Sequence, residues 1–206
     1  PMFNYLKASG IHTGLHFWGI LPDSTEPNLA YPGPTLKPSL DLVQTTIDIA
    51  ANYGFTYVNV HVGNLSLIKV DLAQQTWTPN QSSPRITLDL AETTFASSTH
   101  LLHKYAANKN VLFLVEPVPA RSQFRSTILP QYALPVASLI KLAHKYHLGV
   151  TNDFCHIFAD EYDQPLSVLW QSLLDKSIAL APYTKLLHIN TVVPPYKGTD
   201  NHGGIT

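Results

Sequence analysis

Short apolar runs of strand length recur along this chain, and each ends at or next to a side chain that can bind a metal ion. The runs are rich in β-branched residues, as strands buried in a parallel sheet are. All except the last are followed by a loop and then by a helical pattern. This alternation predicts an α/β fold with a parallel sheet and right-handed crossovers. The five predicted strands span residues 12–17, 56–61, 111–116, 149–153 and 185–190.

Helical patterns fill most of the intervals between these strands. Ser39 can cap the first helix, in which Val43, Ile47 and Ala50 share one face and which Gly54 ends. The other predicted helices span residues 89–107, 132–147 and 166–180. Two further segments show little periodicity and are expected to be loops, namely residues 64–85 and 118–130. Long loops of this kind are often functional lids.

The chain length and the strand spacing bound the architecture. The 206 residues have room for one sizeable core, so we expect a single domain over residues 1–206. Glu116, Asp153 and His188 lie 37 and 35 residues apart, and one βα unit needs roughly 30 or more residues. Five strands cannot close an eight-stranded barrel, and they would leave two apolar edges, which natural proteins avoid. We therefore expect either an incomplete barrel from a longer polypeptide or an open sheet covered in another way.

Composition narrows the possible functions. Charged residues make up 13% of the chain, the net charge is −1, and no basic block indicates a dedicated nucleic-acid surface, although a local patch can still form. The single cysteine, Cys155, excludes an intramolecular disulfide. No apolar run reaches the length of about 18 residues that a membrane span needs, and no secretory leader is visible. We expect a cytoplasmic protein that does not enter a membrane.

The carboxyl ends of parallel strands lie at one edge of their sheet, where acidic and imidazole side chains can build a common metal centre. Asp153 and His156 form the sharpest motif, because two ligating groups three residues apart can approach one ion. Asp200 and His202 can chelate an ion from an extended segment, since residues i and i+2 point the same way. Glu116 can bridge two ions through its two oxygens. The predicted ligands are His16, His61, Glu116, Asp153, His156, His188, Asp200 and His202.

The motifs that carry this prediction are His61-Val62-Gly63, Glu116, Asp153-Phe154-Cys155-His156, His188-Ile189-Asn190 and Asp200-Asn201-His202. In order and spacing they resemble the xylose isomerase-like TIM-barrel superfamily. That superfamily holds endonuclease IV, a nuclease of apurinic/apyrimidinic sites, and many sugar and sugar-phosphate isomerases and epimerases. The resemblance covers most of the chain as a series of short motifs. It implies a (β/α)8 TIM-barrel fold of which this chain holds about five strands, roughly the third to the seventh.

The ligand pattern of the nuclease is the closer match, and it implies three zinc sites joined in part by a shared glutamate. The implied ligand sets are His16, His61 and Glu116; Glu116, Asp153 and His188; and His156, Asp200 and His202. A ninth ligand, a glutamate after the last strand, would lie beyond Thr206. The isomerase alternative would use one Mn²⁺ or Mg²⁺ on Glu116, Asp153 and His188, with His156 on the substrate.

Three departures from the nuclease pattern weaken the transfer of a DNA substrate while leaving the metal ligands in place. Thr191 stands where the nuclease usually has aspartate after its His-x-Asn motif. Asn201 replaces a basic residue between Asp200 and His202. Pro117 after Glu116 is nearer to the isomerase style.

Glu116 and His156 are the residues expected to take part in catalysis, and three further side chains are candidates for binding the substrate. Trp18, just after the first strand, can form a platform, although aromatic residues beside a sheet are more often core. Arg121 and Arg125 follow Glu116 in a loop and are the best basic candidates for gripping a phosphate, with ordinary surface arginine as the alternative.

Simpler roles compete with these assignments. Asp153 and His156 can be a structural hydrogen-bonded pair, and Asp200 and His202 can be loop residues without a role. Cys155 is expected to be a small packing residue. The residues expected to be ordinary surface or packing groups are His12, His100, His103, His144 and His147, together with an acidic, solvated loop of Asp160, Glu161 and Asp163.

Three functions remain open on this evidence. The first is zinc-dependent hydrolysis of a phosphodiester, with abasic DNA as the substrate that the resemblance implies. The second is isomerisation or epimerisation of a small sugar or sugar phosphate with one divalent metal. The third is a barrel remnant that binds a ligand or partner without catalysis. The histidine-rich ligand set favours the hydrolase. The sequence does not indicate the oligomeric state.

Overall fold

A computed structural model describes residues 5–6, 8–119, 122–124, 127–129, 133–160, 164–192 and 202–203. Five strands form one sheet in the order β1-β2-β5-β8-β9, and every neighbouring pair is parallel. The strands are β1 (Gly14–His16), β2 (Tyr57–His61), β5 (Leu112–Glu116), β8 (Val150–Asp153) and β9 (Thr184–His188). The α/β architecture and the five parallel strands were both predicted, and together the strands form half of a barrel.

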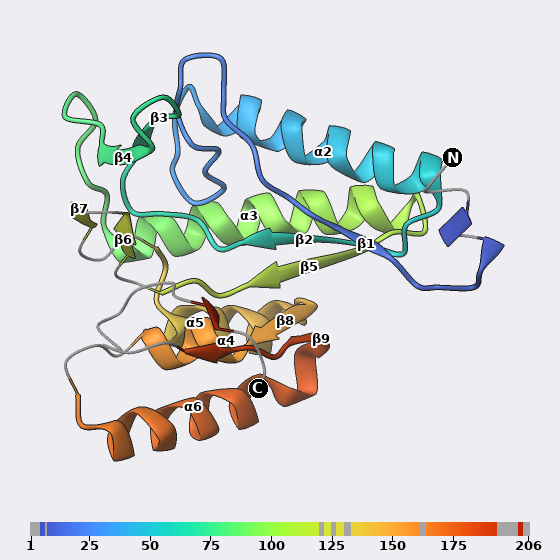
Figure 1. The fold of residues 1–206 in the computed structure, drawn as a ribbon. Coiled ribbons are helices and arrows are strands. Elements are labelled where there is room, and N and C mark those ends of the chain that lie inside the picture. Colours follow the sequence, from blue (N-terminus) through green and yellow to red (C-terminus); the bar gives the residue numbers. More distant parts are fainter. Residues whose placement is uncertain are drawn as a thin grey trace.

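Four long helices connect these strands, and a short helix follows β8 directly. They are α2 (Leu36–Tyr53), α3 (Leu88–Ala107), α4 (Val136–Tyr146) and α6 (Leu166–Leu180), with α5 (Phe154–Ala159) after β8 and the 3₁₀ turn η1 (Ala181–Tyr183) after α6. Figure 1 shows α2 and α3 in the upper part of the view and α4 and α6 in the lower part, and the members of each pair contact one another. The short helix α5 was not predicted.

The start of α2 corrects the predicted cap. The helix begins at Leu36, and Ser39 lies inside it. The buried Ser39 hydroxyl donates to the Thr35 carbonyl over 2.7 Å and accepts from the Asn28 backbone N–H over 3.0 Å. Its hydroxyl therefore joins the helix to the preceding loop, a tertiary role that a local capping pattern cannot reveal. Gly54 ends the helix, as predicted, and it does so in the left-handed conformation, with φ of 75°.

Both segments predicted to be loops contain β-hairpins. The segment 64–85 forms β3 (Ile68–Asp71) and β4 (Thr76–Pro79), and the segment 118–130 forms β6 (Ser122–Phe124) and β7 (Thr127–Leu129). Strands of three or four residues are too short to give a clear period in the sequence. In Figure 1 the two hairpins lie at the end of the molecule towards which β2 and β5 point.

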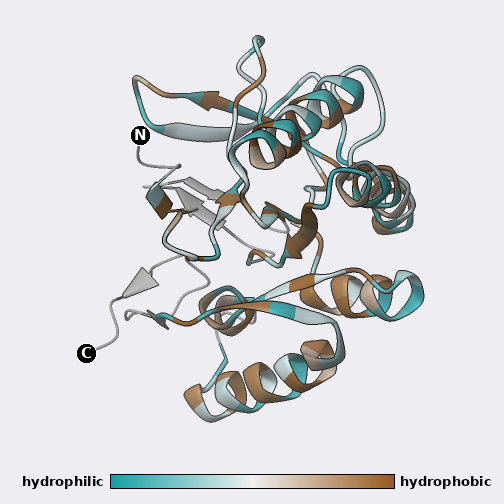
Figure 2. Ribbon diagram, turned by 90° about the vertical axis from the view of Figure 1, so that its right-hand side faces the viewer, coloured by the Kyte–Doolittle hydropathy of each residue, from teal (hydrophilic) through white to brown (hydrophobic). Residues whose placement is uncertain are grey.

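The sheet and helices enclose one core. Phe113, Leu114 and Val115 of β5 are buried, as predicted for a strand of a parallel sheet that is covered on both faces. The same prediction is wrong at Leu112, the first residue of β5, which is 39% exposed. Of the predicted apolar face of α2, Val43, Ile47 and Ala50 are fully buried, and Leu42, which belonged to the same prediction, is partly exposed. By contrast, α6 buries Leu169 and Leu180 but leaves Trp170 57% exposed. Figure 2 shows α6 as the lowest helix, with many apolar residues along it. Among the helices of the described residues, none is long and apolar enough to cross a membrane.

Candidate metal centre

Five potential ligands occupy the last residue of the five parallel strands. They are His16, His61, Glu116, Asp153 and His188, at the ends of β1, β2, β5, β8 and β9 respectively. The register places His61 beside Glu116 and Asp153 beside His188. The convergence predicted from the sequence is therefore present at one edge of the sheet.

Glu116 lies at the centre of this cluster. Its side chain is 1% exposed, and an isolated buried carboxylate is costly. Its Oε2 lies 2.9 Å from His16 Nε2 and 3.8 Å from His61 Nε2. Its Oε1 lies 2.8 Å from His188 Nδ1 and 3.4 Å from His156 Nδ1. Four imidazoles from four segments thus surround one carboxylate.

The cluster divides into two sets of potential ligands that share Glu116. The imidazole group consists of His16, His61 and Glu116, and the carboxylate group consists of Glu116, Asp153 and His188. Within each set, one ligand atom per residue lies within 4.8 Å of the others. The rings of His16 and His61 meet edge to face, with centroids 4.8 Å apart.

Asp153 provides a direct test of whether these residues suit a cation. Its Oδ1 accepts the His156 backbone N–H over 2.8 Å, so it caps α5. Its Oδ2 is fully buried and accepts no hydrogen bond from any described residue, although His188 Nδ1 lies 3.3 Å away. Buried carboxylate oxygens normally have a partner. A divalent ion between Glu116, Asp153 and His188 would supply one, so the residues fit such an ion.

His156 is held by more than its neighbour Asp153. Its ring is 2% exposed, and its Nδ1 lies 2.7 Å from the Pro117 carbonyl oxygen. A carbonyl can only accept, so Nδ1 carries the proton and Nε2 is the nitrogen that can ligate an ion. A structural hydrogen bond between Asp153 and His156 was the simpler alternative to shared metal binding. Such a bond exists, but its donor is the backbone N–H of His156, so the imidazole does not take part in it.

The cluster shifts the protonation of its members. Burial works against ionisation of Glu116, but hydrogen bonds with His156, His16 and His188 and the charge of His61 hold the pKa of its carboxyl well below the usual range. Interaction with Asp153 and the hydrogen bond with Glu116 raise the pKa of His188 to about 9, against the opposing effect of burial. A proton on His188 therefore balances the carboxylates at neutral pH, and a metal ion would have to displace it.

Two polar residues beneath the cluster were missed from the sequence. Asn59 Nδ2 donates to Glu116 Oε2, and the Thr151 hydroxyl donates to Asn59 Oδ1 over 2.7 Å. Both residues are fully buried. A signal was available, because Asn59 precedes His61 by two residues and Thr151 precedes Asp153 by two. Residues at that spacing in a strand point to the same face.

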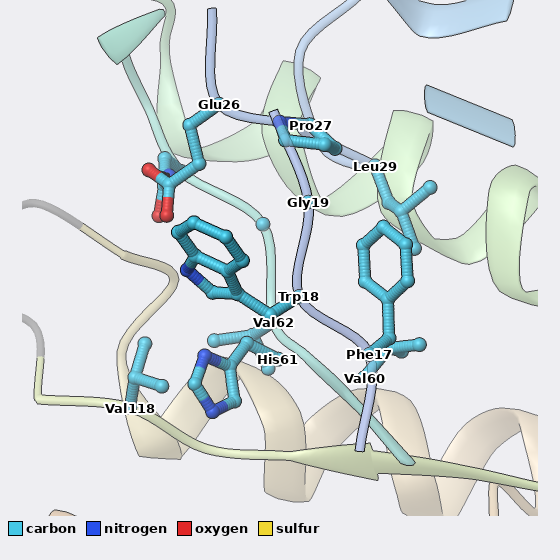
Figure 3. Close-up of a pocket in the computed structure, with 12 residues that line it drawn as sticks. Phe17, Trp18, Gly19, Glu26, Pro27, Leu29, Val60, His61, Val62 and Val118 are labelled. Carbon is cyan, nitrogen blue, oxygen red and sulfur yellow. Dashed lines mark hydrogen bonds between the residues drawn. The ribbon is translucent and has the colours of Figure 1, made fainter. Parts of the chain in front are cut away.

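A pocket lies beside the cluster on the His61 side. Trp18 is 62% exposed and lines this pocket together with Glu26, His61 and Asn64. Figure 3 shows the Trp18 indole between the Glu26 carboxylate and the His61 ring. Asn64 Nδ2 donates to Glu26 Oε2 over 3.1 Å, and the buried Asn64 Oδ1 has no hydrogen-bond donor among the described residues. The pocket therefore offers an aromatic surface with oxygen acceptors at its edge.

Several sequence predictions fall outside the described residues. Arg121, Arg125 and Asp200 are among them, and only the backbone of His202 is described. His202 begins β11 (His202–Gly203), which pairs with β10 (Thr191–Val192) a few residues after His188. Strand β10 contacts α5, the helix that carries His156. The backbone thus brings His202 towards the cluster, while its role as a ligand stays a prediction.

The residues that were expected to have no role in the site are partly confirmed in that role. The histidines expected to be ordinary are exposed and belong to neither ligand set, namely His12, His100, His103, His144 and His147. Cys155 is fully buried, as expected of a packing residue. The prediction of a solvated acidic loop is wrong at Asp160, whose side chain is 5% exposed and bonds Lys176 of α6 over 2.9 Å. Glu161 and Asp163 lie outside the described residues.

Comparison with known proteins gives the chain a family. A family model described as a xylose isomerase-like TIM barrel matches residues 4–205. No curated protein matches the chain. Endonuclease IV from Thermus thermophilus superimposes with a TM-score of 0.58 and 19% identity, over 98% of this chain and 62% of that one. A D-tagatose 3-epimerase-like protein gives a TM-score of 0.60 and 14% identity, over 97% and 62%.

A further solved structure is a xylose isomerase-like TIM barrel protein from Mycobacterium smegmatis in complex with magnesium. It gives a TM-score of 0.50 and 14% identity, over 93% of this chain and 56% of that one. Identities at this level show a shared fold. The chain is shorter than its structural relatives and spans about 62% of the length of several of them, including the epimerase-like protein.

Proposed function

This chain belongs to the xylose isomerase-like TIM barrel family, and on that premise we propose that it carries the metal-binding part of a zinc-dependent phosphodiester hydrolase of the apurinic/apyrimidinic endonuclease type. The structural relatives include both an endonuclease and an epimerase-like protein, so the fold alone does not choose between the two chemistries. The choice rests on the side chains at the strand ends.

The observation that supports hydrolysis is the second ligand set. The isomerase alternative would use one divalent ion, for which Glu116, Asp153 and His188 offer a set of ligands. His16 and His61 add an imidazole group on the other oxygen of Glu116. A pair of ions joined by one carboxylate can hold the attacking and leaving oxygens of a displacement at phosphorus.

The donor types support zinc in the imidazole group. Two imidazoles and a carboxylate are ligands that Zn²⁺ commonly takes in catalytic sites. The carboxylate group has two carboxylates and one imidazole, which suit zinc and also harder ions. A third zinc on His156, Asp200 and His202 remains part of the proposal and stands on the sequence motif, with the β10–β11 pairing as support.

The bound ions would acidify a water and stabilise charge on a phosphoryl oxygen. Glu116 would hold the two ligand sets in register through its two oxygens. His156, fixed by Pro117, would present Nε2 to an ion or to the substrate. Trp18 would provide an apolar surface for the substrate beside His61, and Asn64 Oδ1 would accept a hydrogen bond from it. Arg121 and Arg125 are the proposed phosphate-binding residues.

The alternative is an isomerase or epimerase of a small sugar or sugar phosphate, with Mn²⁺ or Mg²⁺ in the carboxylate group. One observation favours it: the pocket beside Trp18 is edged by Glu26 and Asn64, whose oxygens suit sugar hydroxyl groups. A barrel remnant without catalysis is the second alternative, because the chain spans about 62% of its structural relatives. Metal-dependent turnover by the full chain would rule out this non-catalytic alternative.

Metal content and substrate cleavage test the proposal together. We expect at least two zinc ions per chain by elemental analysis and strand cleavage at an abasic site in duplex DNA. His61→Ala should lose one zinc and the cleavage, whereas His100→Ala, on the exposed face of α3, should keep both. A chain that holds a single ion, leaves abasic DNA intact and exchanges a ketose proton with deuterium would instead establish the isomerase.

A further inference from the structure

The floor of the metal centre contains a polar chain that neither ligand set uses. Asn59 sits in the middle of β2 between Val58 and Val60, where asparagine is an unfavourable strand residue. Thr151 sits in β8, next to a shift in the register between β8 and β9. Both side chains are fully buried, so each needs a hydrogen-bond partner, and each finds the other.

The chemistry of the groups fixes the direction of every bond in this chain. An ionised carboxylate can only accept, so the Asn59 amide must turn its NH₂ towards Glu116. Its carbonyl oxygen then faces Thr151, whose hydroxyl must donate to it, over 2.7 Å. The Glu116 carboxylate sets this amide orientation, and the Thr151 hydroxyl secures it by satisfying the buried Asn59 carbonyl oxygen.

Reversal of the Asn59 amide would damage the site. The carbonyl oxygen of Asn59 would then face Glu116 Oε2 at hydrogen-bond range, and two acceptors would oppose each other in a dry interior. Oε2 is the oxygen that meets His16 and His61, so the damage would fall on the imidazole group first. The carboxylate group meets the other oxygen, Oε1.

We propose that Asn59 and Thr151 are positioning residues that orient Glu116, with Thr151 locking the Asn59 amide so that its NH₂ holds Oε2 in place for the imidazole group. The inference rests on the proposed function for the identity of that group as a metal site. The orientation itself concerns the metal-free chain and can be tested separately. Outer-sphere hydrogen bonds of this kind typically change metal affinity by about 10- to 100-fold when they are lost.

The first test observes the amide without any metal. In ¹⁵N-labelled, metal-free protein, the Asn59 side-chain NH₂ signals are assigned by their loss in Asn59→Leu. We expect shifted, slowly exchanging NH₂ protons in the wild type and in Thr151→Ser, and an averaged, faster-exchanging signal in Thr151→Val. Thr151→Ala replaces the valine variant if that variant does not fold. Signals that do not respond to loss of the hydroxyl would overturn the proposal.

The second test measures Zn²⁺ affinity by competition with a chromophoric chelator. Thr151→Val should weaken one of the two binding steps by about 10- to 100-fold, and Thr151→Ser should restore it. In the Asn59→Leu background, the Thr151→Val change should have no further effect, because Thr151 acts only through Asn59. A merely structural role for Thr151 would lower the melting temperature of the metal-free chain, and its effect would persist in the Asn59→Leu background.

The possible results distinguish failure of the positioning role of Thr151 from failure of the proposed function. An unaltered Zn²⁺ affinity in Thr151→Val, in a chain that binds two ions, would refute the positioning role and leave the proposed function standing. A wild-type chain that binds no ion would refute the proposed function and the role in metal binding, while the amide signals would still decide the orientation of Asn59.

Discussion

The two ligand sets around Glu116 differ in both chemistry and exposure. In the imidazole group, the side chains of His16 and His61 are 42% and 39% exposed, and His61 lines the pocket beside Trp18. In the carboxylate group, Asp153 is fully buried, its Oδ1 is used to cap α5, and the pKa of His188 is raised. One carboxylate thus joins an open, nitrogen-rich set to an oxygen-rich set that is closed at Asp153 and is 31% exposed at His188.

This difference suggests a division of labour within the proposed centre. In the closed set, Asp153 is buried and its Oδ1 is fixed by the backbone N–H of His156, so this set suits an ion that stays in place. The open set faces the pocket, so it suits an ion that meets the substrate. The comparison therefore predicts that changes to the two sets will have different consequences, although they share Glu116.

Removal of the shared carboxylate should have the largest effect. Glu116→Gln keeps the shape of the side chain but removes the charge that both sets use, so we expect loss of both ions and of all metal-dependent activity. Elemental analysis and Zn²⁺ titration measure the result. Glu92→Gln is the matched control, since Glu92 is a buried carboxylate paired with Lys141 between α3 and α4. Retention of two ions by Glu116→Gln would show that the sets do not depend on a common bridge.

Removal of the charge of Asp153 should separate the two sets. Asp153→Asn keeps an oxygen to cap α5 but takes a carboxylate from the closed set. We expect it to lose binding of Mn²⁺ and Mg²⁺ and one zinc ion, while the second zinc ion stays on His16 and His61. The reciprocal variant His61→Ala should keep Mn²⁺ binding. Manganese binding that survives in Asp153→Asn and disappears in His61→Ala would reverse the proposed division.

The sequence predicted the convergence of the strand ends better than it predicted the loops around them. Strand ends are set by hydrophobic runs, and a parallel sheet must bring those ends together, so His61, Glu116 and His188 could be placed from topology alone. The partners of the ligands could not, because a hydrogen bond such as Asn59 to Glu116 joins residues 57 positions apart. The hairpins of residues 64–85 and 118–130 were missed because their strands are very short.

Helix α6 shows a limit of the apolar pattern. Its leucines are spaced so that Leu169, Leu173 and Leu174 fall close together on the helix, but of these only Leu169 is buried, and Leu174 is 54% exposed. The pattern indicates which positions suit burial, and burial also needs a neighbour to cover them. Among the described residues, α6 contacts α4, α5, η1 and β8. The boundaries of α6 were nonetheless predicted without error.

The smallest expected effect lies in the outer helix layer and checks that the others are specific to the site. Asp48 of α2 bonds Lys109 over 2.8 Å and the Tyr105 hydroxyl over 2.9 Å. The hydrogen bond from Lys109, with the bond from Tyr105 and the charge of Lys109, holds the pKa of Asp48 below its ordinary value of 3.8, against the opposing effect of burial. Stabilisation by a lowered carboxylate pKa is present above pH 3.8 and is lost as the pH falls through the pKa of the folded state.

Asp48→Asn should therefore lower the melting temperature slightly at pH 7, because exposed ion pairs contribute little. The difference from the wild type should disappear as the pH is lowered below about 3.8, where Asp48 is protonated in the unfolded chain and then in the folded chain. Zn²⁺ and Mn²⁺ binding should be unchanged. Thermal melts at several pH values and a metal titration measure both results. Loss of either ion from Asp48→Asn would mean that metal binding depends on the global stability of the chain. The variants of the two ligand sets would then have to be compared at temperatures where their free energies of unfolding are equal.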